Sequence, residues 1–129
     1  MSLDETSQAR KLLIVDDSKV SRMRIRAFFA SHCPTWHIEE AGSGDEAIAS
    51  SASFQPDFVT MDVNMPGISG FEAAELLMER HPKVHVVMLT ANIQESSRVQ
   101  ALALNATFIK KPATEPVVRE AVDYFLAAP

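Results

Sequence analysis

The chain has few of the residues that close disulfides, cross membranes or attract nucleic acid. Cys33 is the only cysteine, so no disulfide can form within the 129 residues, and a reducing compartment suits the chain. No apolar run approaches the roughly 20 residues that a membrane-spanning helix needs. Aspartate and glutamate (17) outnumber lysine and arginine (12), and the net charge of −5 disfavours non-specific nucleic-acid binding, which needs a basic surface. We therefore expect a cytoplasmic protein that binds neither membranes nor nucleic acid directly.

The residues that are present predict one α/β domain. Apolar residues make up 47% of the chain and charged residues 22%, values that are typical of globular proteins. Residues 1–10 lack periodicity and are expected to form a flexible tail, which leaves residues 11–127 as the domain. Short apolar runs predict five strands, at 12–15, 36–41, 58–61, 84–89 and 107–109. Helical patterns alternate with them, at 18–32, 44–52, 70–80, 93–104 and 115–127.

The helical segments carry start signals and apolar stripes. Ser43 with Glu46, and Ser69 with Glu72, have the spacing of capping boxes. In the helix at 18–32 we expect one stripe to face the core, formed by Val20, Met23, Ala27 and Phe28. In the helix at 115–127 the inward residues are expected to be Val118, Ala121, Val122 and Phe125.

We expect no chemical role for two helix arginines, the cysteine or the histidines, although the arginines allow two interpretations. Arg22 and Arg26 share a helix face, which is either a solvated surface or a docking site for an acidic partner. Cys33 is expected to be a small residue at a helix end. The scattered histidines are expected to be surface or packing residues; they are His32, His37, His81 and His85.

Strands that alternate with helices predict a parallel sheet, with right-handed crossovers and helices on both faces. In such a sheet the ligand site lies beyond the carboxyl ends of the strands. The residues that follow the predicted strands are therefore the candidates for function: Asp16, Asp17, Asp62, Thr90, Lys110 and Lys111.

Three carboxylates at one edge of a sheet need an explanation. Two unit charges about 4 Å apart repel by roughly 4 kcal/mol at an effective dielectric constant near 20. Such a cluster binds a cation, shares a proton or destabilises the fold. Its oxygen ligands suit Mg²⁺ or Mn²⁺. A lysine and a threonine hydroxyl beside it would complete what a transferred phosphoryl group needs, and an aspartate carboxylate can act as the nucleophile.

The motifs resemble one family as a set. They are LLIVDDS (12–18), AGSGDEAI (41–48), PDFVTMDVNMPGISG (56–70), VVMLTA (86–91) and FIKKP (108–112). Their order and spacing are similar to those of the receiver (CheY-like) domain of bacterial two-component response regulators. The resemblance implies a flavodoxin-like doubly wound sheet of five parallel strands, in the order 2-1-3-4-5, flanked by five helices.

The resemblance also implies roles for individual residues. Asp62 would be the phosphoacceptor. Asp17 would bind Mg²⁺ directly and Asp16 through a water molecule, with the backbone carbonyl of Asn64 as a further ligand beside Asp62. Thr90 would bond a phosphoryl oxygen and, with the aromatic residue Phe108, would form the switch. Lys111, rather than its neighbour Lys110, would contact the phosphoryl group, and the Lys111–Pro112 peptide bond would be cis.

The function that the resemblance implies is that of a signalling switch, which catalyses only its own phosphorylation and dephosphorylation. A sensor histidine kinase or a histidine phosphotransfer domain would supply the phosphoryl group. The face formed by helix 93–104, strand 107–109 and helix 115–127 would then bind a downstream protein target. The chain is expected to be a monomer or a weak dimer.

Two alternatives remain at this point. A degenerate receiver would act as an interaction module without phosphorylation, although all five functional positions are intact. An aspartate-nucleophile phosphohydrolase is the other; such enzymes place D-x-D on the first strand, whereas Asp16 and Asp17 are adjacent. A flavin- or nucleotide-binding module of similar fold is disfavoured, because DDSKVS (16–21) would repel phosphate in the absence of a metal.

Overall fold

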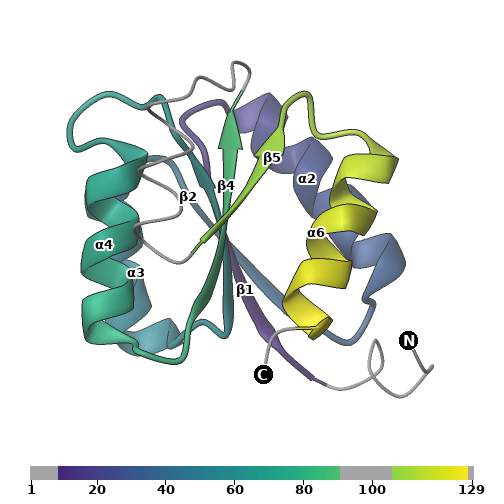
Figure 1. Cartoon of the computed structure of the whole chain (residues 1–129), viewed down its shortest axis with the longest axis horizontal. Coiled ribbons are helices and arrows are strands. Elements are labelled where there is room, and N and C mark those ends of the chain that lie inside the picture. The colour runs from purple at the N-terminus through teal and green to yellow at the C-terminus, as the bar shows by residue number, and fades with distance from the viewer. Residues whose placement is uncertain (1–8, 91–105, 128–129) are drawn as a thin grey trace.

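A computed structural model describes residues 9–90 and 106–127 of the chain. With the labels of Figure 1, its elements are β1 (Lys11–Val15), α2 (Lys19–His32), β2 (His37–Ala41), α3 (Gly44–Phe54), β3 (Phe58–Asp62), α4 (Gly70–Arg80), β4 (His85–Thr90), β5 (Thr107–Lys110) and α6 (Glu115–Ala127). The strands form one parallel sheet in the order β2-β1-β3-β4-β5, which confirms the predicted topology. The helix predicted at 93–104 lies outside the described residues. None of the described helices is both long enough and apolar enough to cross a membrane.

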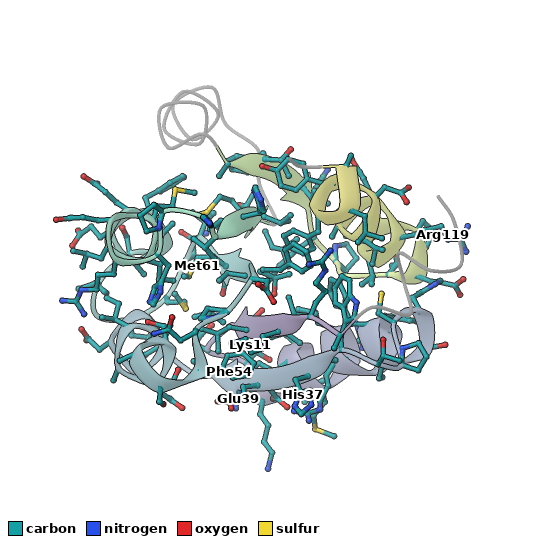
Figure 2. All side chains as sticks on the ribbon, turned by 90° about the horizontal axis from the view of Figure 1, so that it is seen from below. Lys11, His37, Glu39, Phe54, Met61 and Arg119 are labelled. Carbon is teal, nitrogen blue, oxygen red and sulfur yellow. The ribbon has the colours of Figure 1, made fainter. Side chains whose placement is uncertain are left out.

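Helices cover both faces of the sheet. In Figure 1, α3 and α4 lie on one side and α2 and α6 on the other, and Figure 2 gives a second view of the two layers from below. Successive side chains of a strand point to opposite faces, so β1 contributes to both layers. Leu12 and Ile14 pack toward α2 and α6, whereas Leu13 and Val15 pack toward α3 and α4. This explains why the central strands are almost unbroken apolar runs.

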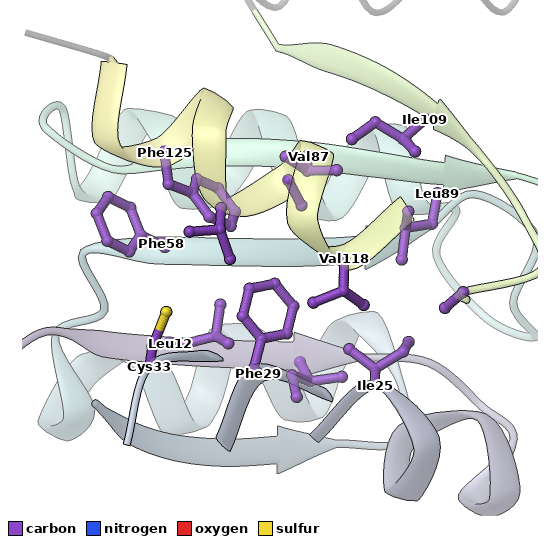
Figure 3. Close-up of a cluster of buried hydrophobic side chains, with 14 of the residues drawn as sticks. Leu12, Ile25, Phe29, Cys33, Phe58, Val87, Leu89, Ile109, Val118 and Phe125 are labelled. Atoms are coloured by element: carbon purple, nitrogen blue, oxygen red, sulfur yellow. The ribbon is translucent and has the colours of Figure 1, made fainter. Parts of the chain in front are cut away.

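Aromatic rings fill the layer between the sheet and the helices α2 and α6 (Figure 3). The rings of Phe58 and Phe125 stack with their centroids 4.6 Å apart, and Phe29 lies 6.4 Å from Phe125. Burial on α6 follows the prediction, since its buried residues are Val118, Ala121, Val122 and Phe125. Cys33 caps the end of α2, as expected, and it is fully buried.

The stripe predicted to face the core from α2 is wrong. Val20 is 66% exposed and Met23 57% exposed, Ala27 is exposed as well, and Phe28 is only partly buried. The buried residues of this helix are instead Ile25 and Phe29. The helix carries two apolar stripes, and packing against α6 and Trp36 selects the one that includes Phe29.

The opposite layer is held by α3 and α4, which begin where the sequence predicts. The hydroxyl oxygens of Ser43 and Ser69 accept hydrogen bonds from the backbone N–H groups of Glu46 and Glu72, at 3.1 and 3.2 Å. The Glu46 carboxylate accepts a bond from the N–H of Gly42, one residue before the position that the capping box predicts. These caps set where each helix starts above the carboxyl edge of the sheet.

The first described residues already belong to the sheet. The N–H of His37 donates to the carbonyl of Arg10 at 2.8 Å, so a residue predicted to lie in the tail pairs with β2. The arginines of α2 bind within the chain, because Arg22 and Arg26 both pair with Glu40, at 3.1 and 3.0 Å. The alternative of an acidic docking partner for these two arginines is therefore disfavoured.

Candidate functional site

The register of the sheet brings two of the predicted carboxylates together. Val15 of β1 pairs with Met61 of β3, so Asp16 and Asp62 follow on neighbouring strands and leave the same edge. Carboxylate oxygens of Asp16, Asp17 and Asp62 lie within 4.8 Å of one another. Asp16 and Asp62 are buried and Asp17 is exposed. Among the described residues, this is the one cluster of three or more side chains able to ligate a metal.

Asp16 is held by donors on both of its carboxylate oxygens. Oδ1 accepts a bond from the N–H of Ser18 (2.9 Å), and Oδ2 accepts one from the hydroxyl of Ser21 (2.7 Å). The ammonium of Lys111 lies 2.7 Å from the same Oδ2. Arg22 also donates to the main-chain carbonyl of Asp16, at 2.7 Å. Three donors therefore fix the position of this carboxylate. A buried charge needs such partners, because burying it without them is costly.

Two of these partners were not predicted from the sequence. Ser21 and Arg22 stand in the first turn of α2, where a helix that starts beside the strand end turns its side chains back toward Asp16. The available signal was the distance of five and six residues from Asp16, which spans the loop and one helical turn. This signal is weak, because most polar residues at such positions face solvent.

Lys111 lies between two of the carboxylates. Its ammonium is 2.7 Å from Asp16 and 3.5 Å from Oδ1 of Asp62. Its backbone N–H donates to the carbonyl of Thr90 at 2.6 Å, which ties the end of β5 to the end of β4. The neighbouring Lys110 is exposed, and the predicted cis bond between Lys111 and Pro112 is present.

Asp62 is an unusual carboxyl group because of its surroundings. Burial raises its pKa from 3.8 to about 6; the charge of Lys111 opposes this shift and the charge of Asp16 adds to it. The N–H of Asn64 donates to Oδ1 of Asp62, at 3.3 Å, and also favours the charged form. The Asn64 side chain itself is exposed.

Helix α4 supports Asp62 from behind. A Cβ atom at Gly70 would lie 2.1 Å from the carbonyl oxygen of Asp62, and the N–H of Gly70 donates to the carbonyl of Val63 at 3.2 Å. Only glycine allows this approach of helix and strand. The loop that returns to the helix passes through Gly67, whose φ of +82° also favours glycine.

Of the two remaining predicted residues, Thr90 ends β4 at this edge, whereas Phe108 lies within β5. Thr90 is buried and follows Leu89, the register partner of Asp62. Phe108 is half-buried and packs in the layer of α3 and α4, opposite Met88 of β4. Its ring centroid is 6.5 Å from that of Phe71 on α4.

The donor set fits a hard divalent cation. All three side chains of the cluster offer carboxylate oxygens, and no histidine or cysteine belongs to it. In the part of the chain that is described, no hydrogen bond or ion pair reaches the Asp17 carboxylate, so its oxygens are available as direct ligands. The oxygens of Asp16 are already engaged by three donors.

Within the described ranges, the contacts of the histidines and of Cys33 do not involve the carboxylate cluster. His81 contacts the hydroxyl of Ser51 between α4 and α3 (3.2 Å), and the ring of His85 lies 6.3 Å from that of Phe58. Burial raises the pKa of the Cys33 thiol to about 11, so this thiol is inert at neutral pH.

A doubly wound sheet with three carboxylates and a lysine at the carboxyl edge of its strands defines a recognisable class of α/β protein. Residues 12–123 match the family described as the response regulator receiver domain, and the chain belongs to this family.

Individual relatives agree with this assignment. The transcriptional activator protein ExaE of Pseudomonas putida is 35% identical over 117 residues, which are 90% of this chain and 55% of that protein. Protein CcdB of Bacillus subtilis is 37% identical over 114 residues, 87% of this chain and 93% of that one. The chain therefore spans about half of the first relative and nearly all of the second. The structure of the chemotaxis protein CheY4 of Vibrio cholerae superposes with a TM-score of 0.82 at 26% identity, covering 92% of this chain and 99% of that one.

Proposed function

We propose that the chain is a phosphorylation-dependent switch in which Asp62 accepts a phosphoryl group. The observation that carries this proposal is the convergence of three carboxylate groups within 4.8 Å, with a lysine ammonium 3.5 Å from the buried Asp62. Asp62 lies on a strand end that is fixed by Gly70 behind it and by the ladder with β4 beside it. A nucleophile held in this way needs little reorganisation when the phosphoryl donor arrives.

Asp16, Asp17 and Asp62, with the main-chain carbonyl of Asn64, would hold a divalent cation, for which Mg²⁺ is the best candidate and Mn²⁺ the second. The bound ion supplies charge neutralisation on the phosphoryl oxygens. The available oxygens of Asp17 suit direct ligation, whereas the engaged oxygens of Asp16 suit ligation through water.

The chemistry is a transfer between two protein side chains. A carboxylate oxygen of Asp62 attacks the phosphorus of a phosphohistidine, the P–O bond forms, the P–N bond breaks and the imidazole leaves. Lys111 then lies on the side where negative charge accumulates, and its contact with Asp16 keeps its ammonium in place. In this role the chain catalyses only its own phosphorylation and dephosphorylation.

The new group adds about −1.5 to −2 charges beside Thr90, which would bond one of its oxygens. We propose that Thr90 moves toward the phosphoryl group and that Phe108 follows into the vacated space. The surface that changes includes β5 and α6, and the predicted helix at 93–104, which lies outside the described residues. A protein target that prefers the changed surface is thereby recruited.

We also propose that the phosphodonor, a sensor histidine kinase or a histidine phosphotransfer domain, docks on the exposed side of α2. Val20 and Met23 are its exposed large apolar residues, and Val20 lines an open pocket of about 500 Å³ together with Arg24 and Lys111. An apolar patch beside the site is what a protein donor needs and what a small donor does not. The same partners favour the cytoplasm as the compartment.

A test of this docking face uses two phosphodonors. Met23→Asp should slow phosphorylation by a cognate histidine phosphotransfer domain at least about tenfold and leave phosphorylation by acetyl phosphate unchanged. Ala30→Asp, on an exposed site farther along the same helix, should change neither rate. Equal slowing with both donors would contradict docking at this face.

The central test is mass spectrometry of the intact protein after incubation with acetyl phosphate and Mg²⁺. We expect an adduct with the mass of one phosphoryl group, absent in Asp62→Asn and in EDTA, and retained in Asp57→Asn, which removes a carboxylate at the far end of the same strand. Absence of the adduct in every protein would favour an interaction module that works without phosphorylation. Continuous release of phosphate from phosphoesters would favour a phosphohydrolase.

A further inference from the structure

We infer that Phe71 is a positioning residue that holds the ring of Phe108 in the place it occupies before phosphorylation. This inference rests on the proposed function, because it assigns Phe71 a part in the same switch. The two rings belong to α4 and β5; their centroids are 6.5 Å apart and their planes are inclined by 45°. This geometry lies within the range of favourable aromatic pairs.

Phe108 lies on the same side of the sheet as Thr90. Its side chain is half-buried in the layer of α3 and α4, and Met88 is its register partner on β4. Thr90 follows Met88 by two residues, so both side chains leave the same face of β4. Among the described residues, Phe71 is the one aromatic ring in contact with Phe108. Phe71 is therefore the described aromatic ring that constrains Phe108 on that face.

Phe71 is itself fixed to the phosphoacceptor strand. It follows Gly70, where a Cβ would meet the carbonyl oxygen of Asp62 at 2.1 Å and where the N–H bonds to Val63. The hydroxyl of Ser69 caps the same turn of α4. The ring of Phe71 is thus carried by a turn that rests on the backbone of Asp62. Phe108 thereby gains a link to the phosphoacceptor through α4, separate from the link through Thr90 and β4.

Removing the ring of Phe71 should release Phe108. A leucine at this position retains an apolar side chain but lacks the ring–ring contact that favours the present position. The position that Phe108 would adopt after phosphorylation should then gain population in the unphosphorylated protein, by about twofold to about tenfold. Asp62 should still accept the phosphoryl group in this variant, because the substitution leaves the three carboxylates and Lys111 in place.

The test reads the position of Phe108 through Met88. The methyl group of Met88, labelled with ¹³C, should report the nearby ring by its NMR shift, and beryllium trifluoride with Mg²⁺ serves as a stable substitute for the phosphoryl group. In Phe71→Leu, the metal-free spectrum should move part of the way toward the spectrum with beryllium trifluoride. Phe71→Tyr, which keeps the ring, should restore the wild-type shift. Phe54→Leu alters another partly buried phenylalanine of the same layer, on α3, and should leave the shift unchanged.

The outcomes separate this inference from the proposed function. If all proteins acquire the phosphoryl adduct but Met88 in Phe71→Leu keeps its wild-type shift, the inference is overturned and the proposed function stands. The same displacement in Phe54→Leu would also overturn it, because the effect would then reflect a loosened layer. If wild-type protein acquires no adduct, the proposed function fails and the inference fails with it.

Discussion

The ammonium of Lys111 lies closer to Asp16, at 2.7 Å, than to Asp62, at 3.5 Å. Lys111 is therefore anchored on a buried carboxylate that does not accept the phosphoryl group in our proposal. Because Ser21 and Ser18 hold Asp16 in turn, the lysine is positioned before any ligand binds. This arrangement joins α2, β1 and β5 at the site, and it makes Lys111 important for stability as well as for phosphorylation.

Replacing Lys111 should destabilise the metal-free protein. Lys111→Met leaves Asp16, which is 1% exposed, without its cation, and breaking such a buried pair costs on the order of 3 kcal/mol. Urea unfolding in EDTA measures the loss, and Mg²⁺ should recover part of it by neutralising the same carboxylates. Lys110→Met removes an exposed neighbour and should change the free energy of unfolding by less than about 0.5 kcal/mol. Equal effects of the two substitutions would contradict the assigned role of the Lys111–Asp16 pair.

The raised pKa of Asp62 predicts a pH-dependent cost. Its pKa is about 6 in the folded chain and 3.8 for the ordinary group, so the unfolded state binds fewer protons between these values. Stability from this group is therefore present below about pH 3.8 and is lost as the pH rises through about 6. Asp62→Asn removes the charge and should stabilise the metal-free protein by of the order of 2 kcal/mol at pH 7.5.

The comparison of the two proteins across pH checks this sign. The difference in the free energy of unfolding between Asp62→Asn and wild type should shrink toward pH 4 in EDTA. Mg²⁺ at pH 7.5 should narrow the difference too, by stabilising wild type more than the variant. A constant difference from pH 4 to 7.5 would show that the raised pKa does not contribute.

The close approach of α4 to Asp62 predicts intolerance of a side chain at Gly70. In Gly70→Ala the new methyl group would meet a backbone carbonyl, which cannot rotate away, so we expect a loss of about 1–3 kcal/mol. Phosphorylation by acetyl phosphate should slow as well, because the strand end or the helix must shift. The control is Gly42→Ala, where the nearest atom to the new group would be a side-chain nitrogen of Arg22 at 3.4 Å. Calorimetry measures the stability of both variants. Equal stability of Gly70→Ala and Gly42→Ala would contradict the close contact between α4 and Asp62.

Direct ligation by Asp17 predicts a large effect on metal affinity with little effect on the fold. Asp17→Asn removes a charge from an exposed side chain, so the metal-free stability should change by less than about 0.5 kcal/mol. The Kd for Mg²⁺ should rise about tenfold or more, as isothermal titration calorimetry can measure. Asp123→Asn, exposed on α6, should leave the Kd unchanged. If the Kd for Mg²⁺ changes only slightly in Asp17→Asn, direct ligation by Asp17 is contradicted and other oxygens must bind the ion.

Most of the architecture follows from local patterns in the sequence. The unbroken apolar runs of β1, β3 and β4 predict buried parallel strands and the convergence of Asp16 and Asp62, which the structure shows. The strand order was expected from the family resemblance, and it also agrees with the structure. The serine caps predict the starts of α3 and α4 because a cap is a local interaction between a side chain and the backbone three residues ahead.

Features decided by tertiary packing were not predictable in the same way. The helix α2 has two apolar stripes, and its rotation is set by aromatic contacts with distant parts of the chain, so Val20 and Met23 are exposed. The role of Gly70 depends on a close approach between α4 and β3, and no local pattern encodes that distance. Likewise the partners of Arg22 are Asp16, which follows β1, and Glu40 of β2, so helical spacing alone could not identify them.

The most direct measurement of the central claim identifies the phosphorylated residue chemically. Borohydride reduces an aspartyl phosphate to homoserine, which marks the acceptor permanently in a peptide map. After treatment with acetyl phosphate and Mg²⁺, we predict homoserine at position 62 and unchanged aspartate at positions 16, 17 and 57. Homoserine at any of those three positions, or at none, would contradict the proposal that Asp62 is the phosphoacceptor.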